Sequence, residues 1–187
     1  MLTKITPTIG NILIAEPFML DESFKRSVVL LVNSSEEGDL GYIINYTSDL
    51  LLNEALEECP NAFLPIYYGG PAETDVLNFI HCCPDKIPDG VPIGNGLFWG
   101  GDFGIMKSQI NNFSVKEGEI RFFMGYTGWG PKQLATEIER NEWIVSDHFD
   151  PSLILEDSDI DTWKECIINL GERFAHIANF PEDPQLN

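Results

Sequence analysis

Basic residues are scarce in this sequence of 187 residues. Its 11 Lys and Arg stand against 30 Asp and Glu, which gives a formal net charge of −19 at pH 7. The bases are scattered along the chain, and only Lys25 and Arg26 are neighbours. Because a nucleic acid or an anionic membrane repels such a charge, we expect the chain to bind neither of them directly.

Regularly spaced cysteines and long apolar runs are also absent. No C-x-x-C pair occurs among the four cysteines, which are Cys59, Cys82, Cys83 and Cys166. A secreted disulfide scaffold is therefore not expected. The longest purely apolar run, residues 28–32, is far shorter than the ~20 residues of a membrane-spanning helix. Since Pro7 also interrupts the N-terminal stretch before a signal peptide could form, we expect a cytoplasmic protein.

The motifs of common catalytic and metal sites are missing as well. The sequence has no G-x-S-x-G elbow, no phosphate-binding P-loop and no H-E-x-x-H pair. Asp157, Asp159 and Asp161 alternate like the start of a calcium loop. However, Thr162 stands where that loop needs glycine, and Ile168 where it needs glutamate. We therefore expect no metal and no cofactor.

One short segment, His81-Cys82-Cys83, contains the residue types of zinc ligands. Adjacent residues of a strand point to opposite faces, and no second ligand pair follows elsewhere in the chain. We interpret these residues as part of the core, with His81 hydrogen-bonded at the end of a strand.

The length and the patterning predict one α+β domain covering residues 1–187. Short β-branched and apolar runs predict mostly antiparallel strands over residues 11–15, 27–32, 40–45, 76–81, 120–124 and 143–146. Helices are predicted over residues 53–58, from 103 onward after an Asp102 cap, over 131–141, and as one long element from 159 to 177. The proline- and glycine-rich span 84–104 is predicted to be mostly loop.

The sharpest local feature is the glycine-rich segment of residues 125–130, which we predict to be a turn between a strand and a helix. Exposed backbone N–H groups at a helix start, with Lys132 nearby, could bind a phosphate or a carboxylate. Alternatively, the glycines supply positive φ angles or close packing while aromatic side chains fill the core. We expect Trp129 to be partly exposed, because the flanking glycines place little bulk around it.

Several segments in order along the chain resemble the YqgE/AlgH family of bacterial proteins. They are residues 10–24, 41–45, 68–71, 125–134 with Glu137 and Trp143, and the closing residues 180–187. The resemblance implies a cytoplasmic protein with a strand-rich, partly barrel-like core flanked by helices. It implies little chemistry, since the family is largely uncharacterised. Some members are labelled transcriptional regulators, and with a net charge of −19 such a role would act through another protein.

We therefore interpret the chain as a noncatalytic binding or regulatory module whose partner is a protein or a small ligand. If the family segments meet in space, the ligand- or partner-binding residues are Asp21, Asn45, Gly69, Gly70, Tyr126, Gly128, Trp129, Gly130, Lys132 and Gln133. One alternative is an enzyme that uses Asp21 or His81 as acid or base. Another is a protein that binds an anion or nucleotide at residues 125–130. The sequence does not define an oligomeric state.

Overall fold

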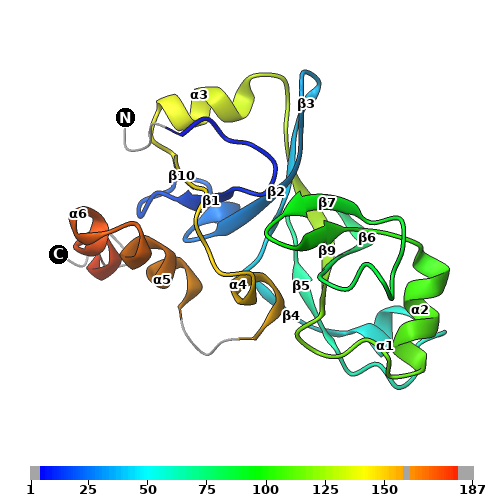
Figure 1. The fold of residues 1–187 in the computed structure, drawn as a ribbon. Helices are drawn as coiled ribbons and strands as arrows, with labels where there is room; N and C mark the ends of the chain where they lie inside the picture. Colours follow the sequence, from blue (N-terminus) through cyan, green and yellow to red (C-terminus); the bar gives the residue numbers. More distant parts are fainter. Residues whose placement is uncertain (1–4, 158–160, 181–187) are drawn as a thin grey trace.

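A computed structural model describes residues 5–157 and 161–180 of the chain (Figure 1). Its strands are β1 (Ile12–Ala15), β2 (Val28–Ser35), β3 (Gly38–Ile43), β4 (Thr47–Leu51), β5 (Pro65–Tyr68), β6 (Ala72–His81), β7 (Val91–Gly94), β8 (Leu97–Trp99), β9 (Ile120–Trp129) and β10 (Trp143–Ser146). Its helices are α1 (Leu52–Ala55), α2 (Phe103–Asn111), α3 (Gln133–Glu139), α4 (Ser152–Leu155), α5 (Thr162–Asn169) and α6 (Glu172–Ala175), with 3-10 turns η1 (Glu22–Phe24) and η2 (Ile177–Asn179).

The strands of the described residues form one sheet in the order β10-β1-β2-β3-β9-β6-β8-β7. These neighbours are antiparallel, whereas β5 joins the sheet by pairing parallel to β9 and antiparallel to β4. The long strand β9 thus pairs with β3, β5 and β6 and connects the two ends of the molecule. The predicted α+β class with mostly antiparallel strands is confirmed, and the sheet does not close into a barrel.

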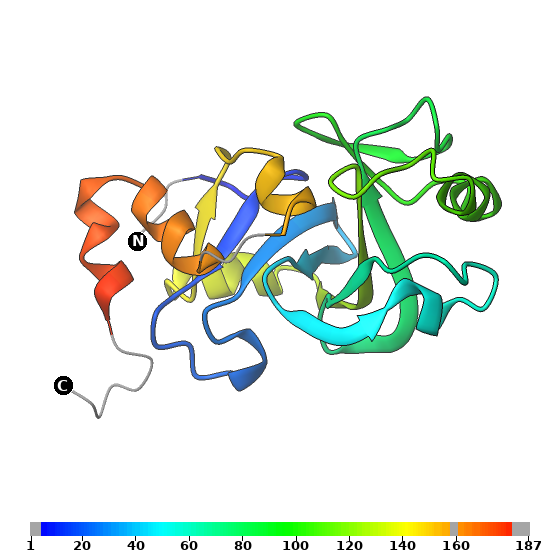
Figure 2. The same ribbon diagram turned by 90° about the horizontal axis from the view of Figure 1, so that it is seen from below.

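One end of the sheet is covered by helices on both faces. Alternate residues such as Ile12 and Ile14 face the core under α4, α5 and α6, while Leu13 and Ala15 face the core under α3. Because both faces are buried, these strands are continuous apolar runs rather than alternating ones. Figures 1 and 2 show α5 and α6 at this end of the molecule and α2 at the opposite end.

The opposite end contains a second cluster of buried side chains, which includes Met106 and Ile110 of α2 and Phe79 and Phe122 of the sheet. The predicted Asp102 cap of α2 is confirmed, since its Oδ1 accepts a hydrogen bond from the backbone N–H of Ile105 at 2.8 Å. This bond satisfies one of the free N–H groups at the helix start.

Several predicted elements differ in the structure. Strands β4 and β5 were not predicted, and the span 84–104 contains β7 and β8 rather than loop alone. Helix α1 covers only four residues, and α3 begins two residues after Pro131. Part of the predicted glycine-rich turn, up to Trp129, is the end of β9, because it pairs with β3.

The predicted long C-terminal helix is instead a series of short elements. Gly171, with φ of 107°, separates α5 from α6, and η2 follows. This conformation is outside the range of a right-handed helix, so the regular spacing of apolar residues continues while the helix does not. Asp161 caps α5 by accepting a hydrogen bond from Lys164 N–H, and the predicted cap Asp159 lies outside the described residues.

Candidate functional site

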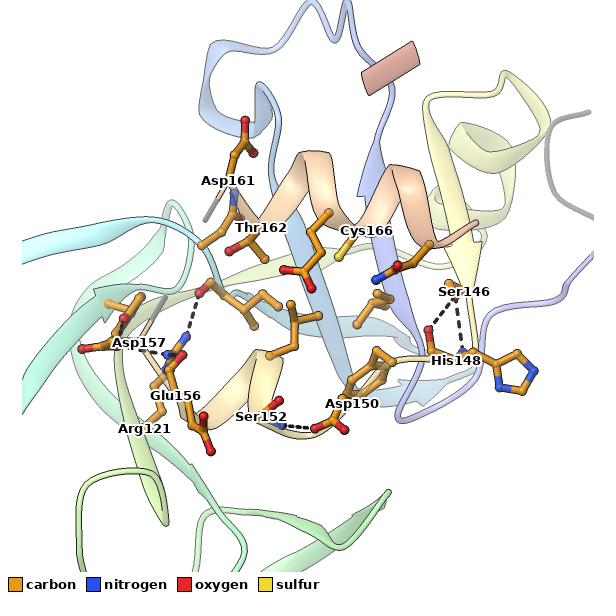
Figure 3. A pocket seen from close by; sticks show the side chains of 18 of the residues that line it. Arg121, Ser146, His148, Asp150, Ser152, Glu156, Asp157, Asp161, Thr162 and Cys166 are labelled. Atoms are coloured by element: carbon orange, nitrogen blue, oxygen red, sulfur yellow. Dashed lines mark hydrogen bonds and ion pairs between the residues drawn. The ribbon is translucent and has the colours of Figure 1, made fainter. Parts of the chain in front are cut away.

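A cavity of about 410 Å³ lies between the sheet and helices α4 and α5 (Figure 3). Apolar side chains of the sheet, of α4 and of α5 line part of it, namely Ile12, Ile44, Phe149, Leu153 and Cys166. Uncharged polar residues also line it, namely Asn45, Thr47, Ser146, Ser152, Thr162 and Asn169. A concave site that combines apolar area with a few polar groups has the general character of a ligand site.

Arg121 of β9 lies at one end of this cavity and is only 5% exposed. Its Nη1 donates to the carbonyl of Ile44 at 3.1 Å, and its Nη2 donates to the carbonyl of Glu156 at 2.6 Å and to Asp157 Oδ1 at 3.1 Å. The guanidinium also stacks over the ring of Tyr67, 4.0 Å from its centroid. Burial lowers the pKa of Arg121, while Tyr67 and Asp157 act in the opposite direction. The guanidinium of arginine stays charged at neutral pH.

Carboxylates outnumber cations around the cavity. Five acidic residues of the described part of the chain line it, namely Asp150, Glu156, Asp157, Asp161 and Glu165. Three of them have defined partners: Asp157 pairs with Arg121, Asp161 caps α5, and Asp150 accepts from Ser152 N–H at 2.9 Å. The carboxylates of Glu156 and Glu165 make no hydrogen bond or ion pair with any residue that the structure describes.

The nucleophilic and metal-binding groups nearby do not form a reactive cluster. Burial raises the pKa of the Cys166 thiol to about 12, so this sulfur stays protonated at neutral pH. The side chain of His148 is 94% exposed and lies 3.5 Å from Asp147. Within residues 5–157 and 161–180, no three His, Cys, Asp or Glu side chains are arranged to hold a metal ion.

Gly69 and Gly70 of the predicted site lie close against the backbone of β9. A Cβ added to Gly69 would lie 2.4 Å from the carbonyl oxygen of Gly125, and one added to Gly70 would lie 2.3 Å from that of Tyr126. Gly125 itself has φ of 73°. These glycines therefore allow β9 to approach residues 69–72, which agrees with the packing alternative stated for residues 125–130.

Trp129 is only 5% exposed, so the expectation of a partly exposed side chain is wrong. Its ring packs edge-on against Trp143 with centroids 5.8 Å apart, and α3 contributes Leu134 and Ile138 to the same cluster. The indole N–H groups of Trp129 and Trp143 both donate to Glu137 Oε2, each at 2.8 Å. The covering helix, which the flanking glycines gave no reason to expect, buries this side chain.

The residues that follow Trp129 bond to one another. The N–H of Gly130 donates to Gln133 Oε1 at 2.9 Å, and Gln133 Nε2 donates to Glu137 Oε1 at 2.9 Å. The predicted anion site would need the Gly130 N–H, which is already occupied. Lys132 is exposed and has φ of 64°. Gly128 is exposed, and a Cβ added there would lie 3.3 Å from the ring of Tyr126.

The remaining predicted residues lie elsewhere. Asp21 is exposed and caps η1 by accepting a hydrogen bond from Ser23 N–H at 2.9 Å. Asn45 accepts from Val28 N–H at 2.8 Å and donates to the carbonyl of Arg26 at 2.9 Å. Of the ten predicted site residues, Asn45 alone lines the cavity within the part of the chain that is described. The predicted ligand-binding role of the ten residues stays a prediction.

His81, the alternative acid or base, is fully buried. Its Nε2 lies 3.0 Å from the carbonyl oxygen of Gly100, and its ring stacks on Phe98. Burial lowers the pKa of His81, because the charged imidazolium is disfavoured away from water. This environment is that of the core residue expected from the sequence. Cys83 is buried as well, whereas Cys82 is exposed, so the expected core position of Cys82 is wrong.

Sequence reasoning did not identify Arg121 or the other residues of the cavity, apart from Asn45. The signal that could have indicated them is the density of Glu and Asp over residues 137–165, which includes all five of the carboxylates named above. Since such a run is usually a solvated surface, it does not by itself define a site.

None of the helices in the described part of the chain is long and apolar enough to cross a membrane.

Comparison with known proteins supports the resemblance found in the sequence. The chain is 42% identical to a UPF0301 protein of Bacteroides fragilis, over 98% of this chain and 93% of that one. It is 35% identical to a UPF0301 protein of Cytophaga hutchinsonii over the full length of both. The solution structure of the AlgH protein from Pseudomonas aeruginosa matches with a TM-score of 0.72 and 26% identity, over 96% of this chain and 98% of that one.

A crystal structure of protein DIP2367 from Corynebacterium diphtheriae shares the fold, with a TM-score of 0.79 and 24% identity over 94% of each chain. The family model described as AlgH-like matches residues 12–175, which includes every strand of the sheet and the residues that line the cavity. The chain therefore belongs to the AlgH-like family of bacterial proteins.

Proposed function

We propose that this chain is a noncatalytic binding module that holds a segment of a protein partner in the cavity between the sheet, α4 and α5. The observation that carries the proposal is the cavity itself, with about 410 Å³ of space, apolar walls and two carboxylates that have no partner among the described residues. Concave sites of this kind are where proteins most often hold ligands.

The chemistry around the cavity favours binding over catalysis. A nucleophile or general base must be accessible and have a pKa suited to its task. The thiol of Cys166 is buried and has its pKa raised to about 12, and Arg121 is engaged by Asp157 and two backbone carbonyls. Neither group is therefore suited to act as a nucleophile or a general base, and both contribute to the structure of the cavity wall.

A regulatory effect on transcription would be exerted through the bound protein rather than through DNA. The chain has 30 acidic and 11 basic residues, and Lys86, Lys107 and Arg121 are each within 3.1 Å of a carboxylate. Because carboxylates far outnumber the remaining cations, the chain would repel a phosphate backbone.

Filling the cavity tests this proposal. Thr162, which is half-buried and lines the cavity, is replaced by tryptophan, and Thr136→Trp on the exposed side of α3 is the matched control. Both variants and the wild type are used as affinity baits in extracts of cells that express the chain, after thermal melts confirm folding. We expect a protein that the wild type and Thr136→Trp retain and Thr162→Trp loses. An identical set of retained proteins for all three baits would contradict the proposal.

A further inference from the structure

We propose that the occupant of the cavity is a basic side chain, lysine or arginine, carried by a segment of the partner protein. This inference rests on the proposed function and names the chemistry that the site recognises. It follows from the charge around the cavity, from its apolar walls and from the way in which the chain already binds a guanidinium there.

The charge around the cavity favours a cation. Among the described residues, five carboxylates line it, and the buried cation Arg121 already pairs with one of them. Glu156 and Glu165 keep their carboxylates free of hydrogen bonds and ion pairs with the described residues. An incoming ammonium or guanidinium group would therefore meet negative charge that the described residues leave unpaired, at the exposed Glu156 and the half-buried Glu165.

The walls of the cavity suit the aliphatic part of such a side chain. Ile12, Ile44, Phe149 and Leu153 supply apolar area next to the carboxylates. Lysine and arginine bury their methylene stems along apolar surface while the charged end stays at a polar position. An inorganic cation would leave these apolar walls uncovered, so an organic cation fits the site better.

The chain itself shows how this end of the cavity binds a guanidinium. Arg121 is held by the ring of Tyr67, the carboxylate of Asp157 and two backbone carbonyls. Tyr67 in turn donates a hydrogen bond to Asp157, which fixes the carboxylate relative to the ring. The guanidinium of Arg121 is bonded to these two carbonyls and to Asp157, not to the side chains of Glu156 and Glu165. Arg121 therefore holds this end of the cavity together and does not neutralise the carboxylates of Glu156 and Glu165.

The acidic surface continues outside the cavity, which favours a protein segment over a small amine. Asp147, which does not line the cavity, is exposed next to the lining residue His148. A small amine would contact only the carboxylates inside the cavity, whereas a peptide with several basic residues could also meet those outside it. The net charge of −19 would attract such a segment from a distance, so binding should weaken as salt concentration rises.

A direct binding assay tests the inference. A fluorescent twelve-residue peptide that alternates lysine or arginine with serine is titrated with the full chain at 0.15 M salt, and anisotropy is measured. The test variant is Glu156→Gln with Glu165→Gln, and the matched control is Glu36→Gln with Glu37→Gln on the exposed β2–β3 turn. Both pairs remove two charges. We expect the cavity pair to weaken binding about tenfold, because two close charge pairs are lost, and the control pair to weaken it less than twofold.

The other outcomes overturn the inference. Equal weakening by the two pairs would show attraction to overall charge without a site, and no measurable binding by the wild type would exclude a basic occupant. Competition by spermine at a lower concentration than by the unlabelled peptide would assign the cavity to a small amine. If the peptide fails while Thr162→Trp still loses a specific protein partner, the proposed function stands and only the basic occupant is wrong.

Discussion

Glu137 should contribute more to stability than the exposed residues of α3, because one of its oxygens accepts hydrogen bonds from two buried indoles. Its Oε2 accepts hydrogen bonds from Trp129 and Trp143, which are 5% and 2% exposed. Hydrogen bonds to charged groups contribute roughly 1.5–3 kcal/mol, and a buried donor without a partner costs roughly 1–3 kcal/mol. We expect Glu137→Ala to lower the free energy of unfolding by about 2–4 kcal/mol, somewhat below the simple sum because water can reach the partly exposed carboxylate position.

Urea unfolding followed by tryptophan fluorescence measures this effect. Glu139→Ala, on the exposed side of the same helix, is the matched control and should change stability by no more than about 0.5 kcal/mol. Glu137→Gln should fall between the two, because one amide oxygen can still accept from both indoles while its NH₂ group faces the donor of Gln133. A loss below about 1 kcal/mol for Glu137→Ala would refute the reasoning and show that the indoles find other acceptors.

Two further predictions concern the core. Trp163 is fully buried and donates to a β1 carbonyl at 2.8 Å, so Trp163→Ala should cost about 3–5 kcal/mol in urea unfolding, against less than about 1 kcal/mol for Ile168→Ala on the exposed side of α5. A cost below about 1.5 kcal/mol would make α5 a loosely attached element. Burial lowers the pKa of His81 below 6.5, so on acidification this imidazole takes up a proton in the unfolded chain before it does so in the folded one. The contribution of His81 to the free energy of unfolding is therefore lost as the pH falls below about 6.5. Between pH 7.5 and 5.5 the wild type should lose stability relative to His81→Phe, whereas His148→Gln should follow the wild type.

The buried strands could be predicted because their burial is encoded locally. Val28–Val32 and Ile12–Ala15 are continuous apolar runs, and a run that is buried on both faces needs no particular partner to be identified as a strand. Helix α2 was equally predictable, since the Asp102 cap and the apolar spacing of Met106 and Ile110 lie within one segment.

The glycine-rich segment could not be interpreted correctly from its own residues. Gly125 and Gly128 suggest a turn, yet the segment is extended because β9 pairs with β3 there. Gly125 is required by the approach of Gly70, which is 55 residues earlier in the chain, because a Cβ at Gly125 would lie 2.5 Å from the Gly70 carbonyl oxygen. Likewise, the burial of Trp129 depends on its contacts with Glu137 and with Trp143 of β10. The small size of the neighbouring glycines therefore does not predict the exposure of this side chain.

The C-terminal segment shows a different limit. The spacing of Trp163, Ile167, Leu170 and Phe174 indicates one amphipathic face, and three of these side chains are buried in the same core as predicted. Periodicity reports which side chains face the core, but it does not report whether the backbone between them is regular. Gly171 has no side chain to contribute to the pattern, and it allows the break that the pattern conceals.

The cavity could not be predicted because no single segment contains it. Its walls come from segments far apart in the sequence, with Ile12 on β1, Ile44 after β3, Arg121 on β9 and Cys166 on α5. In the sequence, Arg121 is a single base within an apolar strand, and only the fold brings it against the carbonyl groups and the carboxylate that hold it. The acidic run near α4 and α5 was visible, but its meaning depends on whether those residues surround a space or face open solvent. That distinction is a property of the packed helices, which place Glu156 and Glu165 beside the cavity.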